Sequence, residues 1–511
     1  MTQPTGIVAA PHPPEPTPPQ AEDAHLHNRV FIGGKDVINS RLSPTDLEDP
    51  QKLRANYESA LKELRIRLGT LLKLDNVSFL IGAGCSLAAG GVSLASIPYK
   101  VEKQLLDEGR PANRTATWLR TLYRCLSICA ADVAKREPDP IRRSALDLLA
   151  GSIIDIPTRK SNLTAASPTG NPVSVDELYK SLFPLNLESV LSSLYMWQAA
   201  SLDGKVALRL EDAPTQMVRV GEIERVIQNL RSAFLATLRL PSEGRQGALD
   251  THRRFVSRVL TRPVNLRRVN LFTLNGDALL EKALDAEGVV AIDGFVGTLR
   301  RVFRPESFDQ DLYFPAETTE GRVHRLDRVI HLYKLHGSVT WRRDEPTWDD
   351  PFGVSAVGDE DAVSDDVLVY PTQLKYGQTL GLPYSEMFRR FGAAIVRPQT
   401  VLFAIGYGFG DEHVNAIVRQ ALVVPSFILV IVDPAPNSPF VNALKKQADT
   451  RAWVFEGDQI GRFDGFTDQL LPDLREEQIL KDTVRTFRAL DPANLGPPAD
   501  EGAAPEAAPV P

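Results

Sequence analysis

Residues 271–284 read LFTLNGDALLEKAL, and this stretch decides the fold. An apolar run stops at Asn275, Gly276 and Asp277, and a helix is predicted to begin almost at once. A strand that passes into a helix through a short polar turn is the repeating unit of α/β proteins. Such junctions hold nucleotides at the carboxyl ends of parallel strands, so Asn275 is the first candidate for a nucleotide site.

Strands and helices alternate on both sides of this junction. Continuous apolar runs predict strands at residues 77–81, 269–274, 329–335, 367–370, 401–405, 427–432 and 452–455. Apolar stripes predict helices at residues 57–72, 115–135, 187–200, 223–240, 251–260 and after Asp411, a suitable N-cap. Continuous apolar strands are typical of sheets covered on both faces. We therefore predict an α/β fold with a Rossmann-like, doubly wound parallel sheet and a large helical insertion.

Bulk composition excludes several classes of protein. The chain has 511 residues, of which 43% are hydrophobic and 24% charged, and its net charge of −7 argues against a general nucleic-acid-coating surface. We find no apolar run of transmembrane length and no secretory signal. The three cysteines, Cys85, Cys125 and Cys129, cannot form a disulfide framework or a four-cysteine zinc site, which favours a cytoplasmic protein without a metal.

The first stretch with chemical potential is GAGCS at residues 82–86. Glycines at a strand end let the backbone approach a pyrophosphate, and a serine there can donate a hydrogen bond. The alternative is a tight turn whose small residues serve packing, and the two are evenly balanced. Cys85 is expected to be a small buried residue rather than a nucleophile. The candidate phosphate-binding residues are Gly82, Ala83, Gly84 and Ser86.

Two further turns carry the candidate catalytic residues. Asn275 has an amide that can orient a water molecule or a ribose hydroxyl, and Asp277 can fix Asn275 or cap the helix. In LHGS, a strand delivers His336 into a glycine turn, where an imidazole can act as a general base. A capped turn and a structurally satisfied histidine are the alternatives, and each is the more common outcome for such a residue in isolation.

The glycine-rich stretch at residues 406–413, GYGFGDEH, repeats the layout of the first. Asp411 and the acidic residue after it suit a helix N-terminus and would compete with a phosphate there. We therefore expect phosphates at the first loop and adenosine near Gly406 and Tyr407. Asp433 ends the run FILVIVD, where it either holds ribose hydroxyls or forms a turn before proline.

Taken in order, these motifs resemble the sirtuin family of NAD-binding proteins. The matching stretches are GAGCS, LNGD, LHGS and GYGFGDEHVN, and the resemblance covers about residues 75–485 apart from the insertion. It is strongest to the bacterial sirtuin-like branch of anti-phage defence, whose members hydrolyse NAD and are often encoded beside a HerA-type ATPase. The segment VYPTQLKYGQTLGLPYSEMFRRF at residues 369–391 and NLESVLSSL at 186–194 also resemble that branch.

Two departures from sirtuin deacylases bear on the reaction. The chain has no CxxC pair, so the zinc module that walls the acyl-lysine channel is missing, and Gly276 stands where the family usually has isoleucine. The resemblance therefore implies an NADase, with Asn275 and His336 catalytic and NAD+ as substrate. The alternatives are an NAD-dependent deacylase or ADP-ribosyltransferase, and a non-catalytic NAD or ADP-ribose sensor.

The resemblance also implies a domain organisation and partners. Residues 31–488 form a sirtuin-like NAD-binding domain that includes a helical insertion at about residues 100–262. The Pro-rich residues 1–30 and the Pro/Ala-rich residues 489–511 are expected to be disordered tails. The expected partners are a second copy of the chain and a HerA-type translocase ATPase, with no membrane and no evident direct contact with nucleic acid.

Overall fold

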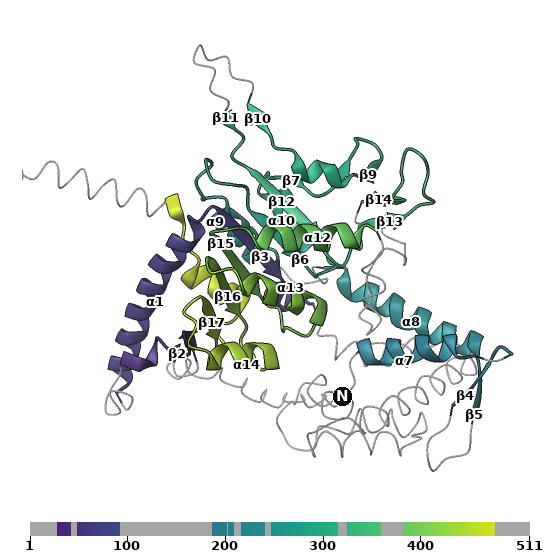
Figure 1. Cartoon of the computed structure of the whole chain (residues 1–511), viewed down its shortest axis with the longest axis horizontal. Coiled ribbons are helices and arrows are strands. Elements are labelled where there is room, and N and C mark those ends of the chain that lie inside the picture. Colours follow the sequence, from purple (N-terminus) through teal and green to yellow (C-terminus); the bar gives the residue numbers. More distant parts are fainter. Residues whose placement is uncertain are drawn as a thin grey trace, which may run out of the picture.

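The core of the protein is a nine-stranded sheet (Figure 1). A computed structural model describes residues 28–41, 49–91, 187–201, 203–208, 216–240, 247–314, 324–358 and 382–475. The sheet has the order β2-β1-β17-β16-β15-β3-β6-β12-β7. Its strands are β1 (Arg29–Ile32), β2 (Lys35–Asp36), β3 (Asn76–Ile81), β6 (Asn270–Thr273), β7 (Val290–Ile292), β12 (Val329–Lys334), β15 (Thr400–Ile405), β16 (Phe427–Val432) and β17 (Ala452–Glu456).

Strand order identifies a doubly wound sheet. The seven strands from β17 to β7 are parallel, and at one edge β1 pairs antiparallel with both β17 and β2. From β3 at the centre, the chain first builds β6, β7 and β12 on one side, and later β15, β16 and β17 on the other. The winding direction therefore switches between β3 and β15, where such sheets bind ligands.

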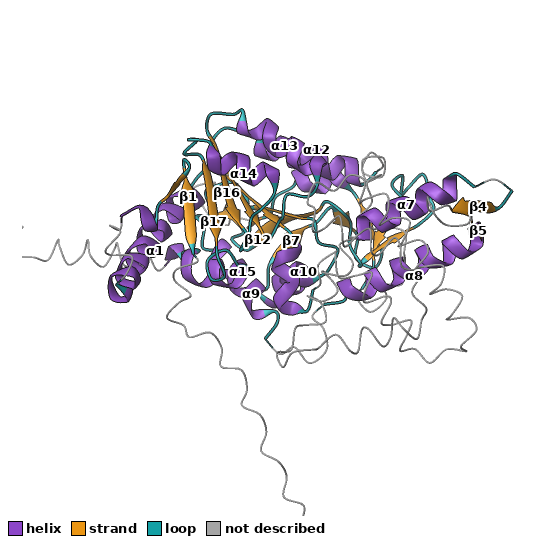
Figure 2. Ribbon diagram, turned by 90° about the horizontal axis from the view of Figure 1, so that it is seen from below, coloured by secondary structure: helices purple, strands orange, loops and turns teal. Residues whose placement is uncertain are grey.

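Helices cover both faces of the sheet (Figure 2). One face carries α1 (Pro50–Leu72), α9 (Asp250–Val259), α10 (Leu279–Ala286), α15 (Phe463–Gly465) and the π-helical turn Phe466–Leu470. The other carries α12 (Tyr384–Ile395), α13 (Glu412–Leu422) and α14 (Pro439–Lys446). Aromatic side chains fill both layers: Phe79 stacks on Phe403 at 4.8 Å on one face, and Phe272 stacks on Tyr333 at 4.6 Å on the other. Burial on both sides explains why these strands are continuous apolar runs.

The predicted α/β fold is confirmed, with small shifts at element ends. Six predicted strands are present, and the bounds of β16 agree with the prediction. Helix α1 begins seven residues before the predicted stripe, because its first turn is largely exposed and has no apolar pattern. Asp49 caps that turn by accepting from two backbone N–H groups, those of Gln51 and Lys52. The predicted strand 367–370 and helix 115–135 lie outside the described residues.

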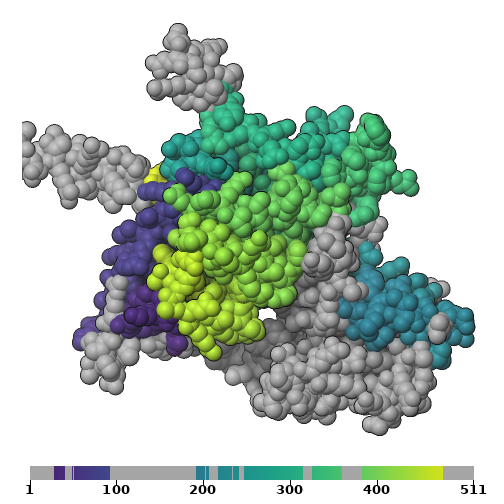
Figure 3. Space-filling model, viewed as in Figure 1, coloured from purple at the N-terminus to yellow at the C-terminus, as the bar shows by residue number. Residues whose placement is uncertain are grey.

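The described residues between 187 and 240 lie together to one side of the sheet (Figure 3). It contains α7 (Leu187–Ala199), α8 (Val220–Leu238) and the hairpin of β4 (Lys205–Leu208) and β5 (Gln216–Arg219). These elements fall in the predicted helical insertion, whose residues 100–186 are outside the described part. The predicted C-terminal tail and residues 1–27 of the predicted N-terminal tail also lie outside it, whereas residues 28–30 are described, with Asn28 buried and β1 beginning at Arg29. No helix in the described ranges is both long and apolar enough to cross a bilayer.

Smaller elements decorate the sheet near β7 and β12. A four-stranded antiparallel sheet joins β8 (Phe295–Val296), β9 (Arg301–Phe303), β13 (Trp341–Arg343) and β14 (Val354–Ala356). A hairpin pairs β10 (Tyr313–Phe314) with β11 (His324–Arg325). The short helical turns are Asn39–Arg41, Ala83–Ala89 and Pro305–Asp309.

Candidate active site

The sheet brings the predicted site stretches to one edge. Thr273 pairs in register with Ile81 and Lys334, and Ile405 pairs with Ile81 and Val432. These residues are the last or nearly the last of their strands, and the strands are parallel. The turns at residues 82–86, 274–277, 335–338 and 406–411 and the residue Asp433 therefore all leave the sheet at its carboxyl edge, around the point where the winding direction switches.

The loops after β3 and β15 touch each other through glycines. A Cβ atom on Gly82 would lie 2.4 Å from the Gly406 carbonyl oxygen, and one on Gly84 would lie 2.8 Å from the Gly406 Cα. The Gly84 N–H also donates to the Gly406 carbonyl at 2.9 Å. Close packing of the two loops thus requires glycine at these positions. The packing reading of GAGCS holds, and a phosphate-binding role of the same backbone stays a prediction.

Gly406→Ala is expected to destabilise the protein by roughly 2–4 kcal/mol. Gly406 has φ of +63°, and an added Cβ would lie 2.7 Å from the Cys85 nitrogen, so the two loops must separate. Chemical denaturation measures the change in the free energy of unfolding. Gly408→Ala is the matched control, because a Cβ there meets no atom within 4 Å. Equal unfolding midpoints for the two variants would contradict the close-packing argument.

The amide of Asn275 is held in one orientation. Its Nδ2 donates to the Gly82 carbonyl at 3.0 Å and to Ser86 Oγ at 3.0 Å. A carbonyl oxygen only accepts, so the nitrogen must face Gly82 and the amide cannot be reversed. Both amide protons are thereby used. The Oδ1 atom of the partly exposed Asn275 is left to accept a hydrogen bond from a hydroxyl group or a water molecule.

Asp277 anchors this arrangement through Ser86. Ser86 Oγ donates to Asp277 Oδ2 at 2.7 Å, while Asp277 Oδ1 accepts from the Leu279 N–H at 3.1 Å in the first turn of α10. The hydroxyl of Ser86, which is 4% exposed, therefore links the Asp277 carboxylate to the Asn275 amide through two hydrogen bonds. The sequence predicts that Ser86 contacts a phosphate, but in this arrangement its only hydroxyl proton is directed to Asp277. The predicted support of Asn275 by Asp277 agrees with this geometry and acts through a serine.

His336 lies beside Asp411. The His336 Nε2 atom is 3.5 Å from Asp411 Oδ2. Asp411 Oδ1 caps α13, as predicted, by accepting from the His413 and Val414 N–H groups. Tyr407 reinforces this end, because its hydroxyl donates to the Asp411 carbonyl at 3.0 Å. The Tyr407 side chain is buried, so a contact with adenosine would have to be made by its backbone.

The Asn275 and His336 turns are joined directly. The Val339 N–H donates to the Gly276 carbonyl at 2.9 Å. This bond links the residue after LHGS to the residue after Asn275, so the two candidate catalytic turns form one continuous wall of the edge. Sequence separation gives no indication of this bond.

The remaining predicted residues lie on the rim. Ala83 is exposed, and Asp433 is half-buried after β16, where its Oδ1 accepts from the Ala435 N–H at 2.9 Å. Burial raises the pKa of the Asp433 carboxyl above its usual value. Asp433 lies next to the Gly406 loop, because the Gly406 N–H donates to the carbonyl of the preceding residue, Val432. Both of the predicted readings of Asp433, ribose contact and turn-former, are compatible with this position.

A histidine that the sequence analysis did not single out lies under the site. His252 on α9 is only 2% exposed, and its ring meets Phe463 edge-on at 5.0 Å. Burial lowers its pKa to about 4, although the Asp277 carboxylate acts in the opposite direction. The imidazole is therefore neutral in the folded protein at neutral pH.

Acid is expected to destabilise the protein through His252. Above pH 6.5 the imidazole is neutral in both states and costs nothing. Between pH 6.5 and about 4 only the unfolded chain takes up the proton, so roughly 3 kcal/mol of stability is lost. Urea unfolding between pH 7 and 4, with His252→Gln as the comparison, isolates this contribution from that of the carboxylates. Parallel stability curves for the two proteins would contradict it.

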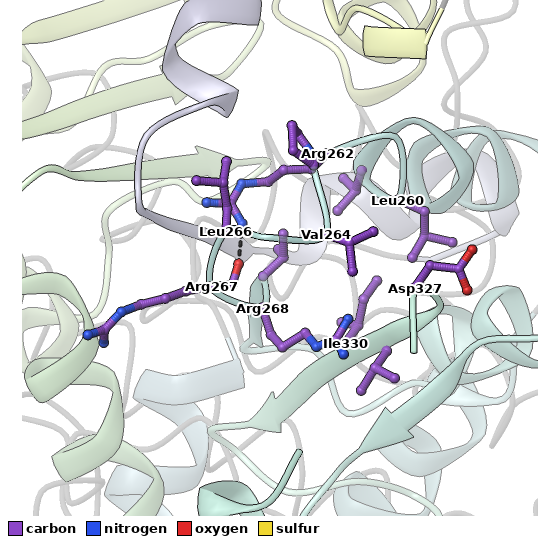
Figure 4. A pocket seen from close by; sticks show the side chains of 12 residues that line it. Leu260, Arg262, Val264, Leu266, Arg267, Arg268, Asp327 and Ile330 are labelled. Atoms are coloured by element: carbon purple, nitrogen blue, oxygen red, sulfur yellow. Dashed lines mark hydrogen bonds between the residues drawn. The ribbon is translucent and has the colours of Figure 1, made fainter. Parts of the chain in front are cut away.

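A small pocket lies at the opposite edge of the sheet (Figure 4). It is lined by residues around the starts of β6 and β12, including Arg262, Arg268 and Ile330. Arg262 donates to backbone carbonyls, among them that of Leu72 at 2.9 Å, and Arg268 pairs with Asp311. These arginines stabilise the fold, and the pocket contains none of the predicted site residues. Among the described residues, no cluster of three or more His, Cys, Asp or Glu side chains could hold a metal ion.

A protein-family model matches the part of the chain that carries most of this site. Residues 269–445 match the SIR2-like domain, a range that contains LNGD, LHGS and GYGFGDEHVN and begins after GAGCS. No curated protein matches the chain significantly. SIR2-like domains are in general NAD-dependent enzymes, and the match supports a sirtuin-like family for this chain.

Proposed function

We propose that this chain is an NAD+ glycohydrolase that cleaves NAD+ to nicotinamide and ADP-ribose. The observation that carries the proposal is the fixed amide of Asn275, which presents an acceptor oxygen beside a histidine-bearing turn at the switch point of the sheet. The SIR2-like match supports NAD as the ligand.

In the proposed reaction, the bond between the nicotinamide nitrogen and the ribose carbon breaks, and a water oxygen bonds to that carbon. Nicotinamide leaves as a neutral molecule, because its ring in NAD+ is already cationic. Positive charge develops on the ribose, as in other glycosyl transfers. Asn275 Oδ1 positions the water or a ribose hydroxyl, and His336 accepts the proton that the water loses. The Asp411 carboxylate, 3.5 Å from His336 Nε2, orients the imidazole electrostatically.

The same proposal distributes the rest of the dinucleotide along the edge. The turn at Gly82, Ala83 and Gly84, of which Ala83 is exposed, meets the phosphates, while the Ser86 hydroxyl holds Asn275. Gly406, the backbone of Tyr407 and Asp433 flank the adenosine. The chemistry needs no protein-bound metal, since the leaving group requires no Lewis acid.

The biological setting that we propose is bacterial anti-phage defence by NAD depletion in the cytoplasm. The resemblance of GYGFGDEHVN and residues 369–391 to the defence branch supports this setting. An oligomer of this chain with a HerA-type translocase ATPase fits the same resemblance. Since uncontrolled NAD loss kills a cell, the partner is proposed to gate the activity.

Nicotinamide release tests the proposal. Purified protein is incubated with NAD+, alone and with a HerA-type ATPase, and products are separated by chromatography. Equimolar nicotinamide and ADP-ribose are expected. Label transferred from NAD+ to a protein would indicate an ADP-ribosyltransferase, and acyl-ADP-ribose formed with an acylated peptide would indicate a deacylase. Tight NAD+ binding without products in both arms would indicate a sensor and contradict hydrolysis.

A further inference from the structure

A buried lysine connects the two candidate catalytic turns. Lys334 is the last residue of β12 and is 3% exposed. Its ammonium group donates to the backbone carbonyl of Asp277 and, at 2.7 Å, to Glu281 Oε1. Lys334 therefore binds the start of α10 to β12. In the sequence it precedes His336 by two residues.

Glu281 extends the connection back to the His336 turn. The same Oε1 atom lies 3.5 Å from the hydroxyl of Ser338, which is also 2.9 Å from Thr340 Oγ1. The other carboxylate oxygen, Oε2, is buried without a hydrogen-bond partner in the described part of the chain, although a quarter of the side chain is exposed. The network thus runs from the residue that anchors Asn275, through one ion pair, to the turn that carries His336.

An ion pair is an expensive way to fill this space. Desolvation of two charges is only partly offset by their attraction, and apolar residues of similar size often stabilise a protein as much. Simple packing would therefore not require Lys334 in a strand that is otherwise mostly apolar. A charge-assisted bond from Lys334 to the Asp277 carbonyl fixes the position of the Asn275 turn relative to β12 more strictly than an apolar contact does.

We propose that Lys334 is a positioning residue that sets the Asn275 turn against the His336 turn, with Glu281 as its counterion. This inference rests on the proposed hydrolysis of NAD+ and adds a residue to it. Lys334 touches neither the substrate nor the reacting water. Its removal is expected to displace Asn275 from His336 while the surfaces that bind NAD+ stay in place.

The test compares Lys334→Met/Glu281→Gln, which removes both charges together, with Lys334→Arg, which can span the same two acceptors. For the double variant kcat is expected to fall roughly 100-fold, since displacements near 1 Å have effects of this size. Its KM should change less than about threefold, because substrate binding is retained. Lys334→Arg should recover much of the lost kcat. Hydrogen–deuterium exchange of residues 274–284 should rise in the double variant and not in Lys334→Arg.

Lys282→Met is the matched control. Lys282 lies on α10 beside Glu281 and, like Lys334, donates to a backbone carbonyl, that of Leu240 at 2.8 Å. That bond leads to neither candidate catalytic turn. The inference is overturned if the double variant keeps wild-type kcat, or if its exchange pattern equals that of Lys282→Met. A wild-type protein that releases no nicotinamide would contradict the proposed function instead, and the exchange data would then decide the inference alone.

Discussion

Asn275→Ala is expected to lower kcat for nicotinamide release by roughly 100- to 1000-fold, the effect of deleting one preorganised polar group from an active site. The substitution removes the fixed Oδ1 acceptor and frees Ser86 Oγ, while the loops held by Gly82 and Gly406 keep their contact. Titration of NAD+ into the variant should show binding close to wild type. The measurement is nicotinamide production under saturating NAD+.

Asn275→Asp makes this test sharper. The side chain keeps its size, but a carboxylate has no proton for the Gly82 carbonyl or for Ser86. Two acceptors would then face each other at 3.0 Å, so this variant should be as inactive as Asn275→Ala and less stable. Asn442→Ala, at an exposed asparagine on α14 whose amide donates to the nearby Asn437 carbonyl, controls for loss of an amide. Full hydrolysis by Asn275→Asp would refute the role assigned to the amide.

His336→Ala is expected to lower kcat by roughly 100- to 10,000-fold, the range for removal of a general acid–base group. The imidazole is the only group assigned to accept the proton from water in the proposed reaction. Nicotinamide release by the variant and by the wild-type protein should be measured side by side under saturating NAD+. A variant with wild-type kcat would show that the histidine is structural.

Asp411→Asn separates the two roles of Asp411. Asparagine caps helices as well as aspartate does, so α13 should keep its N-terminus and the protein its stability. The negative charge 3.5 Å from His336 Nε2 is lost, and kcat is expected to fall about tenfold. Equal thermal unfolding with reduced turnover would support the positioning role, whereas equal turnover would remove Asp411 from the site.

Local pattern predicts much of this fold. Continuous apolar runs give the parallel strands, and Asp411 is identifiable as an N-cap because a helical stripe follows it. Asn275 and His336 are identifiable because polar residues interrupt apolar runs at strand ends. All of these signals lie within a few residues of the feature that they predict.

Local sequence patterns do not predict contacts between segments that are distant in the sequence. Cys85 Sγ bonds to the Ile405 carbonyl across 320 positions of sequence, and no periodicity announces that β3 and β15 are neighbours. The direction of the Ser86 hydroxyl depends on Asp277, 191 positions away. Lys334 did offer a signal, a lysine in a mostly apolar strand, but its partner Glu281 becomes evident only from the pairing of β12 with β6.

The contact of Gly82 and Gly84 with Gly406 also determines when, during synthesis, the candidate site can form. The first loop leaves the ribosome early, yet the strand that must lie against it follows only after several hundred further residues have been added. At the usual rates of translation this interval lasts tens of seconds. A nascent chain therefore lacks the contact between the two loops for most of its elongation, and the proposed hydrolysis of NAD+ could begin only after the second loop has been made.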